Sequence, residues 1–155
     1  HAASTLAGMA FNTASLGINH SLAHAAGAKF HVPHGRLNSI LMPHVIQYNA
    51  GIEFNNRNRQ AIDKTVAIRY QDIAKLLGCS ASSPVSGVRQ LVEAIKKLQR
   101  KLEMPTSLRE YGVKADAFAQ YKVEISEAAL HDGCTPTNPR VPTAEELLKV
   151  LEKAF

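Results

Sequence analysis

The chain has little cysteine and no long apolar run, and both shortages narrow the classes of protein to which it can belong. Its 155 residues include only two cysteines, Cys79 and Cys134, which lie far apart. They could pair, but they do not make the disulfide framework of a secreted domain, so we expect a cytoplasmic protein. No run of 18 or more apolar residues and no basic-then-apolar leader occurs. We therefore predict a soluble protein without a membrane span.

The sequence also lacks the phosphate-binding motifs of nucleotide-binding folds. Neither GxGxxG nor GxxxxGK[ST] occurs, and apolar strands do not alternate with helices, so we expect no dinucleotide-binding domain within these residues. The length suits one domain, residues 1–155. The first residue is His1, which opens a helix-like run without an initiator methionine, as in a domain excised from a longer protein.

Charge is scarce in the first third of the chain. The formal net charge is +5, but only Lys29, Arg36 and Glu53 are charged between His1 and Asn56. The basic residues concentrate later, chiefly at Lys96, Lys97, Arg100 and Lys101, between the apolar positions of an amphipathic helix. Because no aromatic or motif context accompanies them, we interpret this run as a solvated face and exclude nucleic-acid binding.

Apolar periodicity and capping signals predict an all-α fold. We expect helical pieces from Ala2 to Ala28 broken at Gly17, then helices at about His34–Asn49, Ala61–Leu77, Pro84–Leu102, Lys114–Leu130 and from Thr143 onward, a short turn at Ser107–Tyr111, and loops at Asn49–Arg59 and Asp132–Pro142. The positions expected to face the core are Leu37, Ile40, Leu41, Val45, Ile46, Val66, Tyr70, Ile73, Ala74, Leu77, Val88, Leu91, Val92, Ile95, Leu98, Leu102, Phe118, Tyr121, Ile125, Ala129, Leu147, Leu148, Leu151 and Phe155. Because Ala2–Ala28 carries almost no charge, we also expect that segment to be buried on most sides.

Histidines gather in the segment GINHSLAHAAGAKFHVPHG, residues 17–35. His20 and His24 are four apart and would project from one face of a helix. The small residues around Gly27 would then break the helix, and His34 would open the next one. Imidazole is the commonest side-chain metal ligand, so a metal site is a reasonable hypothesis, although two histidines at this spacing are usually ordinary surface or core residues. His31 leaves open which three of the four histidines would bind.

The longer pattern LAGMAFNTASLGINHSLAHAAGAKFHVPHGRLNSILMPHVIQYN, residues 6–49, strongly resembles the signature region of the iron-containing alcohol dehydrogenases. A second block, DGCTPTNPRVPTAEELLKVLEKAF (132–155), fits the same family, and YQDIAKLLG (70–78) is similar to members related to propanol and aldehyde–alcohol dehydrogenases. The resemblance covers essentially the whole chain. It implies the C-terminal helical domain of an enzyme whose N-terminal nucleotide-binding domain would be its partner, in a homo-oligomer.

The resemblance also implies roles for individual residues. In such enzymes one aspartate and three histidines hold a divalent metal, and His20 and His34 match two of these ligands, the other two lying upstream. Iron is implied, although Zn²⁺ or Mn²⁺ would suit the same donors. His24 matches a catalytic position that relays a proton or orients substrate, Phe11 an aromatic near the nicotinamide of NAD(H) or NADP(H), and Cys134 the edge of the pocket for a small alcohol or aldehyde. Each of the last three residues could instead be ordinary packing.

Two alternatives stay open at this point. A relative of glycerol dehydrogenase or dehydroquinate synthase would share the architecture with other chemistry, although the PHGRLNSILMPHVIQYN and CTPTNPR blocks argue against it. A stand-alone helical module could instead bind a structural metal or a partner.

Overall fold

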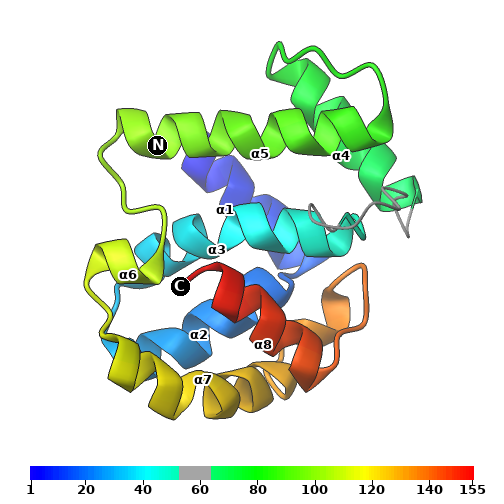
Figure 1. Ribbon diagram of the computed structural model, residues 1–155. Coiled ribbons are helices and arrows are strands. Elements are labelled where there is room, and N and C mark those ends of the chain that lie inside the picture. Colours follow the sequence, from blue (N-terminus) through cyan, green and yellow to red (C-terminus); the bar gives the residue numbers. More distant parts are fainter. Residues whose placement is uncertain (53–63) are drawn as a thin grey trace.

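The computed structural model describes residues 1–52 and 64–155, and in these ranges it is all-helical, as predicted. The elements are α1 (Ala2–Ala14), α2 (Ile18–Phe30), α3 (His34–Asn49), α4 (Lys64–Leu76), α5 (Pro84–Lys101), α6 (Leu108–Tyr111), α7 (Ala115–Leu130), the 3-10 turn η1 (Thr135–Thr137) and α8 (Ala144–Lys153) (Figure 1). Most of the loop predicted at Asn49–Arg59 and the predicted helix start at Ala61 lie outside the described residues. None of the helices in the described ranges is long and apolar enough to cross a membrane.

Local sequence signals set several helix ends where the sequence predicts them. The Ser83 hydroxyl caps α5 by accepting the Ser86 N–H at 3.2 Å. Thr143 and Glu146 form the predicted capping box at the start of α8, each side chain bonding the other residue's backbone N–H. The break at Gly17 also holds, because α1 ends before it and α2 begins after it.

Two apolar clusters build the core, and α3 contributes to both. The larger cluster joins α2, α3, α7 and α8, and its fully buried members include Ile18, Leu22, Leu37, Leu41, Ile125, Leu147 and Leu151. The smaller one joins the end of α3 to the α4–α5 hairpin and includes Ile46, Ala67, Ala74, Val88 and Leu91. Figure 1 shows α3 between the hairpin and the α2, α7 and α8 group. Helix α3 therefore packs against both groups of helices.

The expected burial of the first helix is wrong for the described residues. None of the residues of α1 is buried, and Leu6 and Met9 are 65% and 66% exposed. The low charge of this segment does not bury it because no other described helix packs closely over it. An apolar helix therefore lies open to solvent.

The expected inward faces of α4 and α5 are also partly wrong. Ile73, Leu77, Leu98 and Leu102 are exposed, whereas Ala67, Gln71 and Ala74 are the buried residues of α4. The reason is a close helix crossing: a Cβ atom on Gly87 of α5 would lie 2.5 Å from the Cα of Gln71. At this crossing α4 therefore buries Ala67, Gln71 and Ala74 and leaves Ile73 outside.

The predicted break around Gly27 is wrong as well. Helix α2 continues through Gly27 to Phe30 and ends at His31, which adopts the left-handed conformation with φ of 52°. Helix α3 likewise runs from His34 through Pro43 to Asn49 as one element.

Candidate metal centre

Three histidine rings meet where α2 and α3 adjoin. The ring centroids of His20 and His34 lie 5.2 Å apart, those of His24 and His34 5.1 Å, and those of His20 and His24 6.2 Å. His20 and His24 share one face of α2, as their spacing predicts, and His34 is the first residue of α3. His31 caps α2 and has no ring contact with the other three among the described residues, so the group in contact is His20, His24 and His34.

The short connection between the two helices produces this meeting. The left-handed backbone at His31 turns the chain, and the buried side chain of Val32 fixes the turn against the core. A Cβ atom on Gly27 would lie 3.3 Å from Leu37 Cδ1, which shows how closely α2 and α3 approach. His34 is thereby returned to the face of α2 that carries His20.

The electrostatics of the rings suit metal binding. Burial, followed by repulsion from His34 and His24, lowers the pKa of His20, although Asp132 opposes the shift. Asn38 Nδ2 donates to His34 Nε2 at 2.9 Å, and Asn19 in turn donates to Asn38 Oδ1 at 2.7 Å. The ring of His34 therefore carries a lone pair on Nε2, and a cation bound at this atom would take the place of the Asn38 N–H.

The distances also fit a shared ion. With metal–nitrogen distances of about 2.0–2.1 Å, two imidazoles that bind one ion at a tetrahedral angle bring their centroids to about 5 Å. His20 and His34 satisfy this condition, and so do His24 and His34. Ring separation alone therefore does not distinguish His20 from His24 as the second ligand.

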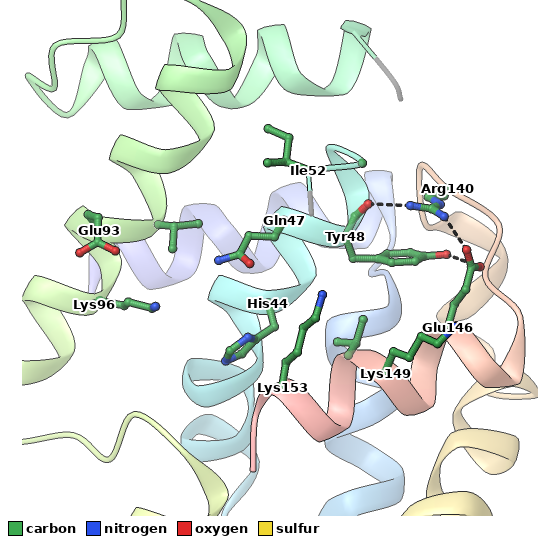
Figure 2. Close-up of a pocket in the computed structure, with 13 residues that line it drawn as sticks. His44, Gln47, Tyr48, Ile52, Glu93, Lys96, Arg140, Glu146, Lys149 and Lys153 are labelled. Carbon is green, nitrogen blue, oxygen red and sulfur yellow. Dashed lines mark hydrogen bonds and ion pairs between the residues drawn. The ribbon is translucent and has the colours of Figure 1, made fainter. Parts of the chain in front are cut away.

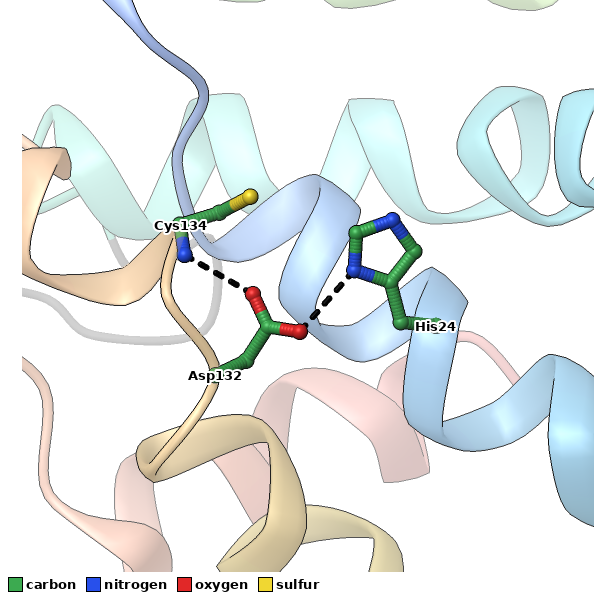
Figure 3. A group of neighbouring side chains, drawn as sticks. All are labelled: His24, Asp132 and Cys134. Atoms are coloured by element: carbon green, nitrogen blue, oxygen red, sulfur yellow. Dashed lines mark hydrogen bonds and ion pairs between the residues drawn. The ribbon is translucent and has the colours of Figure 1, made fainter.

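A carboxylate distinguishes His24 from the other two histidines (Figure 3). Asp132, in the loop after α7, accepts from His24 Nδ1 at 2.9 Å through Oδ2. Its Oδ1 accepts from the backbone N–H of Cys134 at 2.8 Å and from the Ser21 hydroxyl at 3.2 Å. Burial raises the pKa of Asp132, but the hydrogen bonds from Cys134 and His24 outweigh burial and lower it overall. Because an ionised carboxylate can only accept, the proton of this hydrogen bond belongs to His24 Nδ1, and a neutral ring would then carry its lone pair on Nε2.

Cys134 joins this group from the same loop. Ligand atoms of His24, Asp132 and Cys134 all lie within 4.8 Å of one another. Burial and the nearby Asp132 carboxylate raise the pKa of the Cys134 thiol. Both cysteines of the chain are free, so the pairing of Cys79 with Cys134 that the sequence allows is absent. Cys134 therefore presents a thiol, and not a reactive thiolate, beside the histidines.

Other sequence candidates lie elsewhere. Phe11 is half exposed on α1 and makes no ring contact with the histidines within the part of the chain that the structure describes. His44 lies ten residues beyond His34 on α3 and lines a separate pocket. His131 is exposed beside the Asp132 loop.

Sequence reasoning missed the polar partners of the histidines. Asp132 and His24 are 108 positions apart, so only the packing of α7 against α2 brings them together. The pattern Asp-Gly-Cys could have given a signal, since an aspartate often accepts the backbone N–H two residues on. Asn38 gave no signal beyond its place one helical turn after His34.

The whole chain, residues 1–155, matches the model of the Fe-containing alcohol dehydrogenase family, C-terminal. It is 38% identical over 160 residues to an aldehyde-alcohol dehydrogenase of Streptococcus pneumoniae, covering 100% of this chain and 18% of that protein. It is 40% identical over 155 residues to an NADPH-dependent butanol dehydrogenase of Clostridium saccharobutylicum, covering 100% of this chain and 37% of that protein. The chain thus spans well under half the length of these relatives.

Solved structures agree with this assignment. A 1,3-propanediol oxidoreductase superposes with a TM-score of 0.82 and 34% identity, over 99% of this chain and 36% of that one. An iron-containing alcohol dehydrogenase from Thermococcus thioreducens gives a TM-score of 0.82 and 32% identity, over 99% of this chain and 35% of that one. The chain belongs to the Fe-containing alcohol dehydrogenase family and corresponds to its C-terminal helical domain.

Proposed function

We propose that this chain is the C-terminal part of an NAD(P)-dependent, divalent-metal-dependent dehydrogenase that interconverts a small primary alcohol and its aldehyde in the cytoplasm. The observation that carries the proposal is the meeting of the His20, His24 and His34 rings at the junction of α2 and α3. The names of the similar butanol and aldehyde-alcohol dehydrogenases support the substrate class. The nucleotide-binding domain would be supplied by the parts of those enzymes that this chain does not span.

His20 and His34 would hold the metal together with ligands from the remainder of the enzyme. Their contact distance and the lowered pKa of His20 support this role, because a neutral imidazole competes less with protons for the ion. We propose iron, and the same donors suit Zn²⁺ or Mn²⁺. When bound, the ion would supply Lewis acidity toward the oxygen of the alcohol or aldehyde.

His24 would move the proton that alcohol oxidation releases. Its Nδ1 is committed to Asp132, so Nε2 is the atom that can accept a proton. The imidazolium that results would be stabilised by the ionised carboxylate of Asp132. The His24 side chain is 45% exposed, which leaves the ring within reach of a substrate or of a chain of water molecules.

Phe11 and Cys134 would border the spaces for cofactor and substrate. Cys134 lies against His24 and Asp132 and would limit the substrate pocket to small groups. The half-exposed ring of Phe11 offers an apolar surface for the nicotinamide, and the open α1 helix around it suits a surface that another domain covers.

The test is alcohol-dependent NAD(P)H formation by the full-length enzyme with Fe²⁺ or Zn²⁺. We expect His24→Ala to slow turnover by about 10²–10⁴-fold, the usual contribution of a proton-transferring group. His131→Ala, an exposed histidine outside the ring cluster, is the matched control and should leave turnover unchanged. The 155-residue chain alone should be inactive, because one wall of a cleft cannot align the reacting carbon with nicotinamide.

Two results would overturn the proposal. Metal-dependent turnover by the purified 155-residue chain would show that the assigned residues do not need a second domain. A full-length protein that binds metal but turns over no alcohol with NAD⁺ or NADP⁺ would instead favour a structural metal module.

A further inference from the structure

A pocket opens away from the histidine cluster, between the C-terminal half of α3, α5 and α8. Its volume is about 660 Å³, within the range of small-molecule sites. Figure 2 shows His44 on α3 in the part of the pocket that Lys96 of α5 and Lys153 of α8 also line, while Tyr48 points toward Arg140 and Glu146 at the other end. His44 follows His34 by ten residues, or about 15 Å along the helix axis, so the two sites are separate.

The charges around this pocket do not balance. Arg140 is paired with Glu146, whose carboxylate also accepts from the Tyr48 hydroxyl at 2.9 Å. Lys149 is paired with Glu145 at 2.8 Å. These contacts account for the cations at one end of the pocket.

Two lysines stay uncompensated at the other end. Lys96 and Lys153 form no ion pair within residues 1–52 and 64–155, and the only remaining carboxylate of the lining, Glu93, pairs with neither of them. They extend from different helices toward the same space (Figure 2). The pocket therefore offers two ammonium groups without an anionic partner.

Burial and the positive charge of the two lysines both affect the pKa of His44. Burial, then repulsion by Lys96 and Lys153, lowers the pKa of His44 to about 4. The other ionisable groups that line the pocket are Tyr48, Glu93, Arg140, Glu146 and Lys149. At neutral pH the imidazole is uncharged, so it can donate one N–H to a ligand while the lysines supply the charge.

We propose that this pocket binds a small phosphorylated molecule, with a phosphate group between Lys96 and Lys153 and the organic part toward Gln47 and Tyr48. Lysine ammonium groups bind phosphate as compact point charges, and two of them match a dianion. The half-buried phenol of Tyr48, whose ring is covered by the Arg140 guanidinium at 4.2 Å, gives the organic part an aromatic and a polar neighbour. This inference is independent of the proposed dehydrogenase activity, since it shares no side chain with the histidine cluster.

The test is calorimetric titration of the 155-residue chain with inorganic pyrophosphate at constant ionic strength. We expect saturable binding of pyrophosphate, weakened about tenfold by Lys96→Gln and by Lys153→Gln, the lower end for a hydrogen bond between charged groups. Lys97→Gln is the matched control, because Lys97 is exposed on the same helix and does not line the pocket. It should change the dissociation constant less than twofold.

An NMR titration of the His44 ring gives a second readout. Pyrophosphate should raise the pKa of His44, because an anion between the lysines cancels the repulsion that lowers it. No saturable binding, equal effects of the Lys96, Lys153 and Lys97 substitutions, or an unchanged pKa of His44 at saturating pyrophosphate would each overturn the proposal.

Discussion

Asp132→Asn should change the tautomer of His24, because the carboxylate is what places the proton on Nδ1. An asparagine oxygen can still accept from the Cys134 N–H, which lies 2.8 Å from Oδ1. The new amide would then face His24 Nδ1, now 2.9 Å from Oδ2, with an N–H donor. His24 should respond by accepting at Nδ1 and moving its proton to Nε2. The atom proposed to accept the substrate proton would be blocked.

The stability cost follows from replacing a charged hydrogen-bond acceptor with a neutral amide. A hydrogen bond to a charged group contributes about 1.5–3 kcal/mol and a neutral one about 1 kcal/mol, so the difference is about 1 kcal/mol for the partly exposed pair. The pKa of Asp132 is lower in the folded chain than its unfolded value of about 3.9. The advantage of the wild-type chain should therefore be complete above about pH 4 and disappear as the pH falls through the folded pKa.

Long-range ¹H–¹⁵N NMR of the imidazoles and urea unfolding of the 155-residue chain measure the two effects. Asp116→Asn, at an exposed aspartate of α7, is the matched control and should leave the His24 tautomer unchanged. If His24 keeps its Nδ1 proton in Asp132→Asn, and unfolding is unaltered above pH 4, the role given to Asp132 is refuted.

Two further predictions concern packing and pH. Gly87→Ala should destabilise the chain by about 1–3 kcal/mol in urea unfolding, since its Cβ would press on Gln71, whereas Gly35→Ala meets open space and should not. Burial raises the pKa of Glu146, but its hydrogen bonds, first that from the Thr143 N–H, outweigh burial and lower the pKa overall. The loss of stability in Glu146→Gln should therefore be measurable above about pH 4.3 and vanish as the pH falls through the folded pKa. If the free energy of unfolding of Glu146→Gln stayed below that of the wild type by the same amount at low pH, the prediction for Glu146 would be contradicted.

Local sequence patterns predicted most of the helices and the placing of His20 and His24 on one face of α2. The spacing of His20 and His24 requires a shared helix face, and the Thr143 and Glu146 box marks a helix start wherever the segment lies. Such features depend on residues a few positions apart. They therefore hold in the structure without knowledge of what packs against them.

The features that depend on packing could not be predicted in this way. Amphipathic analysis assigned Ile73 and Leu98 to the core, but both are exposed, and α4 instead buries Ala67, Gln71 and Ala74 at its close crossing with α5. The partnership of Asp132 with His24 joins residues 108 positions apart and has no local signature. The exposure of α1 likewise depends on whether another helix packs against it, which its own sequence does not determine.

Metal content of the purified full-length enzyme tests the central claim most directly, that His20 and His34 are ligands and His24 is not. Elemental analysis should find about one metal ion per chain in the wild type and in His24→Ala, and almost none in His20→Ala or His34→Ala. Loss of metal from His24→Ala as complete as from His20→Ala would contradict the account, because the roles of these two histidines would then be exchanged.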